Sequence, residues 1–152
     1  MTSGDLMKAE LDGIFAVKLP VKELATSRRW YEKVFDLTTQ FEFPDEHGVI
    51  RGVAYDCPGL GNSGLALRER PDIAGLSGFD PVLFGVKDKQ AVDAWIAHLT
   101  ALGIEHQLVL ATIGWLVIFH DPDGLEIHLY SRERHGKELA GTPGRGRPAT
   151  GA

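Results

Sequence analysis

The order of apolar and polar positions along the chain predicts two copies of one structural unit. Val21-Lys22-Glu23 returns as Val86-Lys87-Asp88, and Trp30 returns as Trp95 at the same offset. In each copy an alternating apolar run leads through a short acidic junction to apolar residues at helical spacing. A repeat of this length describes a supersecondary unit, and two such units can pair across a pseudo-twofold axis. We therefore expect the functional surface to lie between the two units.

The first copy is predicted to form a strand, a helix and three further strands. Residues 14–21 alternate as a strand with one packed face does. Residues 24–35 carry apolar side chains at helical spacing. Residues 38–43 and 49–56 predict a hairpin, and a short fourth strand begins at Leu65.

The second copy repeats this order. A strand is expected from Val82 to Val86, Asp88 is a suitable N-cap, and Gly103 is a suitable helix stop. Three more strands follow, at 106–110, 114–119 and 125–130. The last two are joined by the sequence Asp121-Pro122-Asp123-Gly124, in which the two aspartates are interpreted as turn formers rather than as a catalytic pair.

These elements divide the chain into five segments. We expect a flexible lead-in, a first module, a linker, a second module and a disordered tail rich in Gly, Pro and Arg. Their bounds are 1–12, 13–69, 70–79, 80–131 and 132–152.

Composition excludes several classes of protein. The net charge of −5 comes without a basic stripe, so nucleic acid is not an expected partner. No apolar run approaches membrane-spanning length, and the first residues lack the apolar core of a signal peptide. Cys57 is the only cysteine, which forbids an internal disulfide and fits a reducing compartment. We therefore expect a cytoplasmic protein without a membrane partner.

Two stretches of the chain carry a family resemblance. Residues 19–37 and 119–129 resemble the vicinal oxygen chelate superfamily, which includes glyoxalase I, extradiol dioxygenases, fosfomycin-resistance enzymes and bleomycin-binding proteins. The resemblance covers roughly residues 13–131. It implies an α+β fold in which two βαβββ modules form a curved eight-stranded sheet around a cleft, with the helices outside. Members often dimerise, so a homodimer is expected.

The same resemblance indicates where a metal site would lie. Metal-dependent members hold their ligands at matched positions on the first and last strands of each module, and here these positions are Ala16, Ala66, Pro81 and His128. Alanine and proline offer no side-chain donor, and one imidazole falls short of the roughly three protein ligands of a catalytic site. Glu126 alone does not make up the difference. The sequence therefore predicts neither the usual catalytic metal nor another cofactor.

Alternation also assigns the cleft without reference to the family. If one face of each first and last strand packs under a helix, the opposite face lines the cleft. That face mixes small and polar groups, as a small-molecule pocket does, although solvated strand-end residues are the alternative. The residues so assigned are Ala16, Lys18, Ala66, Arg68, Pro81, Leu83, Glu126, His128 and Tyr130.

Three aromatic residues on the middle strands have two interpretations. Phe41, Tyr55 and Trp115 can form a stacking wall for a ligand or can pack in the core. The sequence leaves this choice open.

Three functions compete. The first is a non-catalytic protein that binds a small aromatic or partly anionic molecule, which the missing metal ligands and the pair Lys18 and Arg68 favour. The second is an isomerase, lyase or dioxygenase that uses His128 and Glu126 as acid and base, or a rearranged metal site. The third is an interaction module with a vestigial cleft. The sequence favours the first, and so inclines against an enzyme.

Overall fold

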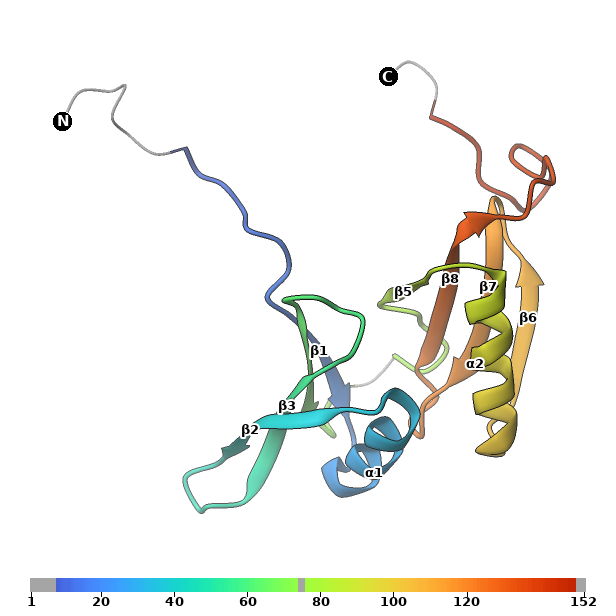
Figure 1. Ribbon diagram of the computed structural model, residues 1–152. Helices are drawn as coiled ribbons and strands as arrows, with labels where there is room; N and C mark the ends of the chain where they lie inside the picture. The colour runs from blue at the N-terminus through green and yellow to red at the C-terminus, as the bar shows by residue number, and fades with distance from the viewer. Residues whose placement is uncertain (1–7, 74–75, 150–152) are drawn as a thin grey trace, which may run out of the picture.

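The computed structural model describes residues 8–73 and 76–149 and contains two modules with the same element order (Figure 1). The first module consists of β1 (Ala16–Val21), α1 (Leu24–Phe35), β2 (Thr38–Pro44), β3 (Ile50–Asp56) and β4 (Gly64–Glu69). The second consists of β5 (Leu83–Val86), α2 (Lys89–Ala101), β6 (His106–Leu110), β7 (Gly114–His120) and β8 (Glu126–Arg134).

Each module has its own four-stranded sheet. The strand orders are β1-β4-β3-β2 and β5-β8-β7-β6, and in both sheets the first strand runs parallel to the last. The α+β class and the two βαβββ modules predicted from the repeat are confirmed. None of the helices in the described residues is long and apolar enough to cross a membrane.

Local signals set the ends of the helices. The Asp88 side chain caps α2 by accepting a hydrogen bond from the Ala91 amide at 2.8 Å. Gly103 follows this helix with a positive φ of 70°, a conformation that favours glycine. At α1 the side chain of the N-cap residue Glu23 makes no capping hydrogen bond, and Glu69 of β4 accepts the Leu24 amide at 2.9 Å instead. The start of α1 is thereby tied to its own sheet.

An edge-strand irregularity decides which way β2 presents its side chains. The pairing of β2 with β3 shifts between Thr39 and Phe41, so Gln40 is an extra residue in the ladder. Thr39 pairs with the buried Tyr55, whereas Phe41 pairs with Ala54. Phe41 and Phe43 therefore lie on the sheet face that is opposite to the helix.

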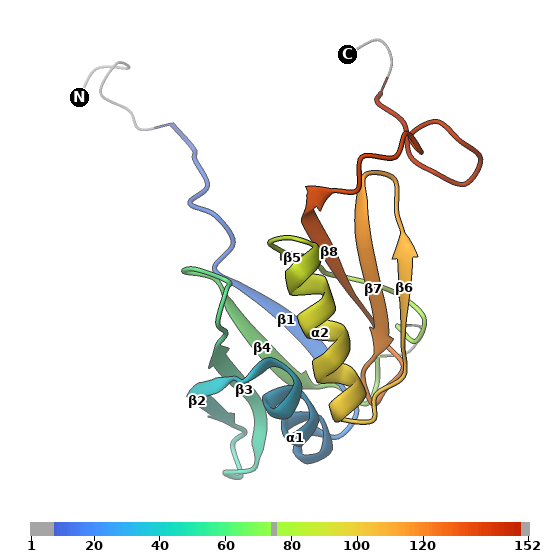
Figure 2. The ribbon, with the colours of Figure 1, turned by 45° about the vertical axis from the view of Figure 1, so that its right-hand side comes forward.

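The core continues from one module into the other through α1. Phe35 of α1 lies 5.4 Å from Phe84 of β5 and 5.7 Å from Trp95 of α2, measured between ring centroids. The His98 Nε2 atom on α2 is 3.0 Å from the Val34 carbonyl oxygen. Figure 2 shows both helices at the junction between the sheets. Within one chain the helices thus meet each other, and the helix-free faces of the sheets are left uncovered.

The matched tryptophans are not the most buried aromatic residues. Trp30 and Trp95 pack against the core, as expected, but both are only partly buried. Tyr31, next to Trp30, is fully buried. It takes this place because α1 turns one side toward its own sheet and another toward the second module.

A buried hydrogen bond joins Tyr31 to the second module. The Tyr31 hydroxyl donates to Asp121 Oδ2 at 2.7 Å, and Asp121 is 5% exposed. Asp121 Oδ1 accepts the amides of Asp123 and Leu125, which closes the turn between β7 and β8. The Lys22 amide donates to Asp123 Oδ2 at 2.9 Å. The predicted turn therefore also attaches the modules to each other.

The described part of the tail differs from the expectation of disorder after Arg132. Strand β8 continues to Arg134 because Ser131 and Arg134 still pair with neighbouring strands. The His135 amide then donates to the Ile113 carbonyl, and the Gly146 amide donates to Thr112 Oγ1 at 3.0 Å. Turns within 135–149 thus lie against the turn between β6 and β7.

Replacing Tyr31 with phenylalanine should destabilise the fold by about 1–3 kcal/mol, because it leaves Oδ2 of the buried Asp121 without its hydrogen-bond donor while Oδ1 keeps its two amides. Urea unfolding measures this change. Tyr55→Phe is the matched control, since its hydroxyl donates to Glu32, which solvent reaches. We expect the control to lose less than the Tyr31 variant, and equal losses would contradict a special role for Asp121.

The stability contributed by Asp121 should depend on pH. Burial raises the pKa of this carboxyl above its ordinary value of 3.8. The folded state therefore holds the proton longer than the unfolded state, and its stability falls as pH rises from about 3.8 through the folded pKa. Asp121→Asn removes this effect. The free energy of unfolding of the natural chain minus that of the variant should fall over this window and then level off, and a rise would contradict the assignment.

Candidate functional site

The helix-free face of the first sheet forms a candidate binding surface. Lys18, Ala66 and Ala54 lie side by side across β1, β4 and β3. Arg68 and Gly52 form the neighbouring row. The alternate residues, such as Leu19 and Leu67, are buried. The predicted division of these strands into a core face and an open face is therefore found in the structure.

A cavity of about 560 Å³ occupies this face. Its floor consists of Gly52, Ala54 and Ala66, whose small side chains leave the space open. Its lining residues come from the first module and from Arg70 directly after it. They are Phe15, Ala16, Lys18, Phe43, Pro44, Asp45, Arg51, Gly52, Val53, Ala54, Ala66, Leu67, Arg68, Glu69 and Arg70.

Phenylalanine rings stand at the edge of the cavity. Phe41 and Phe43 have ring centroids 6.4 Å apart in a stacked arrangement, and both are largely exposed. Phe41 lines a neighbouring hollow of about 400 Å³ that shares Phe15, Ala16 and Ala54 with the first. The strand was predicted to begin at residue 14, but β1 begins only at Ala16, and Phe15 is exposed. These exposed rings offer flat apolar surface to a ligand.

Some charged side chains of the cavity form salt bridges within the chain, and others do not. Arg51 contacts both Asp45 and Glu69. The pKa of Glu69 is lowered by its hydrogen bond from the Leu24 amide and then by Arg51, and the pKa of Asp45 is lowered first by the Val49 amide. All three groups have hydrogen-bond partners, and together they carry one net negative charge.

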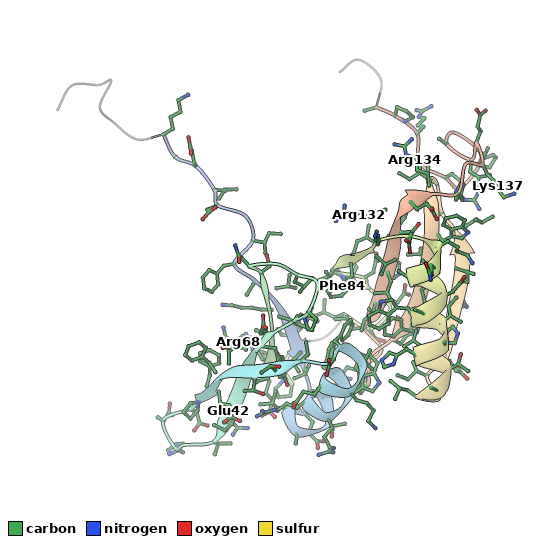
Figure 3. All side chains as sticks on the ribbon, viewed as in Figure 1. Glu42, Arg68, Phe84, Arg132, Arg134 and Lys137 are labelled. Atoms are coloured by element: carbon green, nitrogen blue, oxygen red, sulfur yellow. The ribbon has the colours of Figure 1, made fainter. Side chains whose placement is uncertain are left out.

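Lys18 and Arg68 remain as the uncompensated cations of the cavity. Among the described residues neither has a salt bridge or a side-chain hydrogen bond within the chain. Arg68 lies over the first sheet, far from Arg132, Arg134 and Lys137 at the end of the second module (Figure 3). The cavity therefore has a net attraction for an anionic group.

Two of the three middle-strand aromatics belong to the core side. Tyr55 is 2% exposed and its hydroxyl donates to Glu32 of α1. Trp115 lies on the same face of β7 as the buried Val117, with the Lys89 ammonium of α2 5.8 Å from its ring. Neither residue therefore lies where it could form the stacking wall for a ligand. Phe41 alone of the three is on the open face.

The second module carries the other predicted residues. His128 and Glu126 lie on the helix-free face of β8, with His128 Nε2 2.8 Å from Glu126 Oε1. Asp80, which the sequence did not single out, reaches His128 Nδ1 with Oδ2 at 3.3 Å. Its position directly before Pro81 was the signal that could have identified it.

Tyr130 and the start of β5 complete this face. The Tyr130 hydroxyl accepts the amides of Ile113 and Gly114, at 3.1 and 3.3 Å. Leu83, beside His128 in the sheet, and Pro81 are exposed. The structure thus gathers Ala16, Lys18, Ala66 and Arg68 on the first module, and Pro81, Leu83, Glu126, His128 and Tyr130 on the second. Within one chain it does not bring the two groups around the cavity of the first module.

The matched positions do not fit the usual metal centre. Ala16 and Ala66 border the cavity with aliphatic side chains, and Pro81 adds no donor. His128 is the one imidazole among the four positions. The donor set at these positions therefore cannot bind a metal in the usual way.

Comparison with known proteins identifies the family. The family model of the glyoxalase/bleomycin resistance protein/dioxygenase superfamily matches residues 13–129. The chain belongs to this superfamily. A search of curated proteins finds no match.

Solved structures of several functions share the fold. A lactoylglutathione lyase from Agrobacterium tumefaciens is 23% identical with a TM-score of 0.65, over 82% of this chain and 96% of that one. TnmS3, an antibiotic binding protein from Streptomyces sp. CB03234, is 21% identical with a TM-score of 0.66, over 82% and 98%. A mutant fosfomycin resistance protein, FosX, from Listeria monocytogenes, solved with Mn(II), is 16% identical with a TM-score of 0.63, over 80% and 93%. At these identities the likeness establishes the fold and leaves the activity to be argued from the site.

Proposed function

We propose that this protein binds a small organic molecule on the helix-free face of its first module, without the usual catalytic metal. The observation that carries the proposal is the cavity of about 560 Å³ with a floor of alanine and glycine. Lys18 and Arg68 supply positive charge above this floor, and Phe43 supplies a flat apolar wall. A planar apolar body with an anionic substituent matches this combination.

Binding of aromatic carboxylates tests this proposal. We expect a panel of such compounds to bind more tightly than their neutral amides, as measured by calorimetry. Arg68→Gln should weaken binding by about 1–3 kcal/mol, because a charged hydrogen-bond partner is lost. Arg29→Gln, an exposed change on α1, is the control and should have no effect.

A steric variant tests the location. Ala54→Leu fills the cavity floor and should abolish binding while the chain stays folded by circular dichroism. Equal affinity for carboxylates and amides, or binding unaffected by both cavity variants, would contradict the proposal. Failure of every compound to bind would favour the interaction module with a vestigial cleft.

One contact on the second module supports the alternative function, which is that of an enzyme. The 2.8 Å distance between His128 Nε2 and Glu126 Oε1 is the geometry of a histidine paired with a carboxylate, which suits acid and base chemistry. Lyase, isomerase or dioxygenase activity would then depend on His128. Turnover of a bound compound that His128→Gln eliminates would favour this alternative.

We also propose that two copies associate through their helix-free faces. Exposed apolar side chains lie on both, with Phe41 and Phe43 on the first module and Leu83 on the second. A second copy would bring a second-module face to the cavity of the first module and so complete a cleft.

Leu83→Glu should shift the protein from dimer to monomer, because it places a charge within the proposed contact. Light scattering during size exclusion measures the mass against the 16.6 kDa of one chain. Val49→Glu is the matched control, since Val49 is exposed on the loop before β3. A natural chain that is monomeric would contradict the dimer.

A further inference from the structure

Three potential metal ligands meet on the second module. Asp80, Glu126 and His128 each direct one donor atom into a group whose members lie within 4.8 Å of one another. Glu126 and His128 are two residues apart on β8 and so share one face. Asp80 arrives from the segment before β5, which is fixed by backbone bonds: the Glu126 amide donates to the Phe79 carbonyl, and the Gly78 amide to the Gly124 carbonyl, both at 2.9 Å.

His128 lies between the two carboxylates of this group, Asp80 and Glu126. Nε2 faces Glu126 at 2.8 Å and Nδ1 faces Asp80 at 3.3 Å, so both ring nitrogens point at carboxylate oxygens. A neutral imidazole has a single N–H, and its other nitrogen repels a carboxylate. No lysine or arginine of the described chain forms a salt bridge with Asp80 or Glu126. His120 Nε2 also lies 3.7 Å from Glu126 Oε2, and a bound cation would balance the charge of the two carboxylates.

Geometry is compatible with a cation. Nitrogen and oxygen ligands about 2.0–2.2 Å from a first-row metal lie roughly 3 Å from each other. One metal ion takes only one nitrogen of His128, so Nε2 and Glu126 Oε1, 2.8 Å apart, form the pair with this spacing, and Asp80 supplies the third donor from within 4.8 Å. The His128 side chain is only 14% exposed, so it is held in place, while Asp80 at 45% leaves access from solvent.

We propose that Asp80, Glu126 and His128 bind a divalent first-row transition metal within the second module alone. One imidazole and two carboxylates suit Zn²⁺, Co²⁺, Ni²⁺ or Mn²⁺ and leave open positions for water. Mg²⁺ is a poor fit, because it prefers oxygen ligands alone.

This site differs from the usual one of the superfamily. Two of its three donors, Asp80 and Glu126, lie beside the matched positions rather than at them, and none comes from the first module. It revises the expectation of no metal, which weighed the matched positions and Glu126 but did not include Asp80. The proposal does not rest on ligand binding in the first module, and either can fail without the other.

Cobalt titration of the metal-stripped full chain tests the site. Co²⁺ binding is followed by visible absorption and by calorimetry, and we expect one equivalent per chain. His128→Gln and Asp80→Asn should each weaken binding by more than the roughly 10–100-fold that loss of an outer-shell partner costs. Asp80 is an exposed loop residue, so its variant tests the site even if the His128 variant unfolds.

Two controls make the outcome decisive. His47→Gln removes an exposed histidine that also lies next to a glutamate, Glu46, and should leave the affinity for Co²⁺ unchanged. Mg²⁺ should not displace Co²⁺ at equal concentration. Absence of stoichiometric Co²⁺ binding, or binding that survives both site variants, would overturn the proposal.

Discussion

The hydrogen bond between Tyr31 and Asp121 is the constraint on which the arrangement of the modules depends. A carboxyl group this buried is costly unless its oxygens are satisfied, and here they accept one hydroxyl and two amides. Because the hydroxyl comes from α1 and the amides from the turn between β7 and β8, only one placement of the modules satisfies the group. The aromatic contacts of Phe35 add apolar attraction at the same junction, but they are less directional.

Two sheets of one topology carry opposite chemistry. The first presents alanine and glycine beneath Lys18 and Arg68, which suits a ligand of some size and negative charge. The second presents a histidine between two carboxylates, which suits a proton or a cation. The fold supplies the same open face in both cases, and a few side chains on the first and last strands decide what that face can hold.

The repeat and the alternation were enough to predict the fold and the open faces, because both depend on local periodicity. The helix bounds Leu24–Phe35 and the cap Asp88 were predicted for the same reason. The burial of Tyr31 and the position of Trp115 on the core side depend on how α1 and α2 meet other elements, which no local pattern records. Asp80 was missed because its position beside His128 depends on backbone bonds between residues that are far apart in the chain. The division of the predicted cleft between two faces is likewise a property of how the modules are packed.

The extra residue at Gln40 has a consequence for how such a site can change. Strand β2 is at the edge of its sheet and pairs only with β3, so the ladder absorbs one additional residue without disturbing the strands beneath α1. After Gln40 the alternation of side chains between the two faces starts anew. The face on which Phe41 and Phe43 lie is therefore independent of the face on which Thr39 lies. Insertions and deletions here would alter the reach of the aromatic rim while the cavity floor and the core stay the same. The edge strand is thus the part of this scaffold on which ligand preference can diverge at little cost to folding.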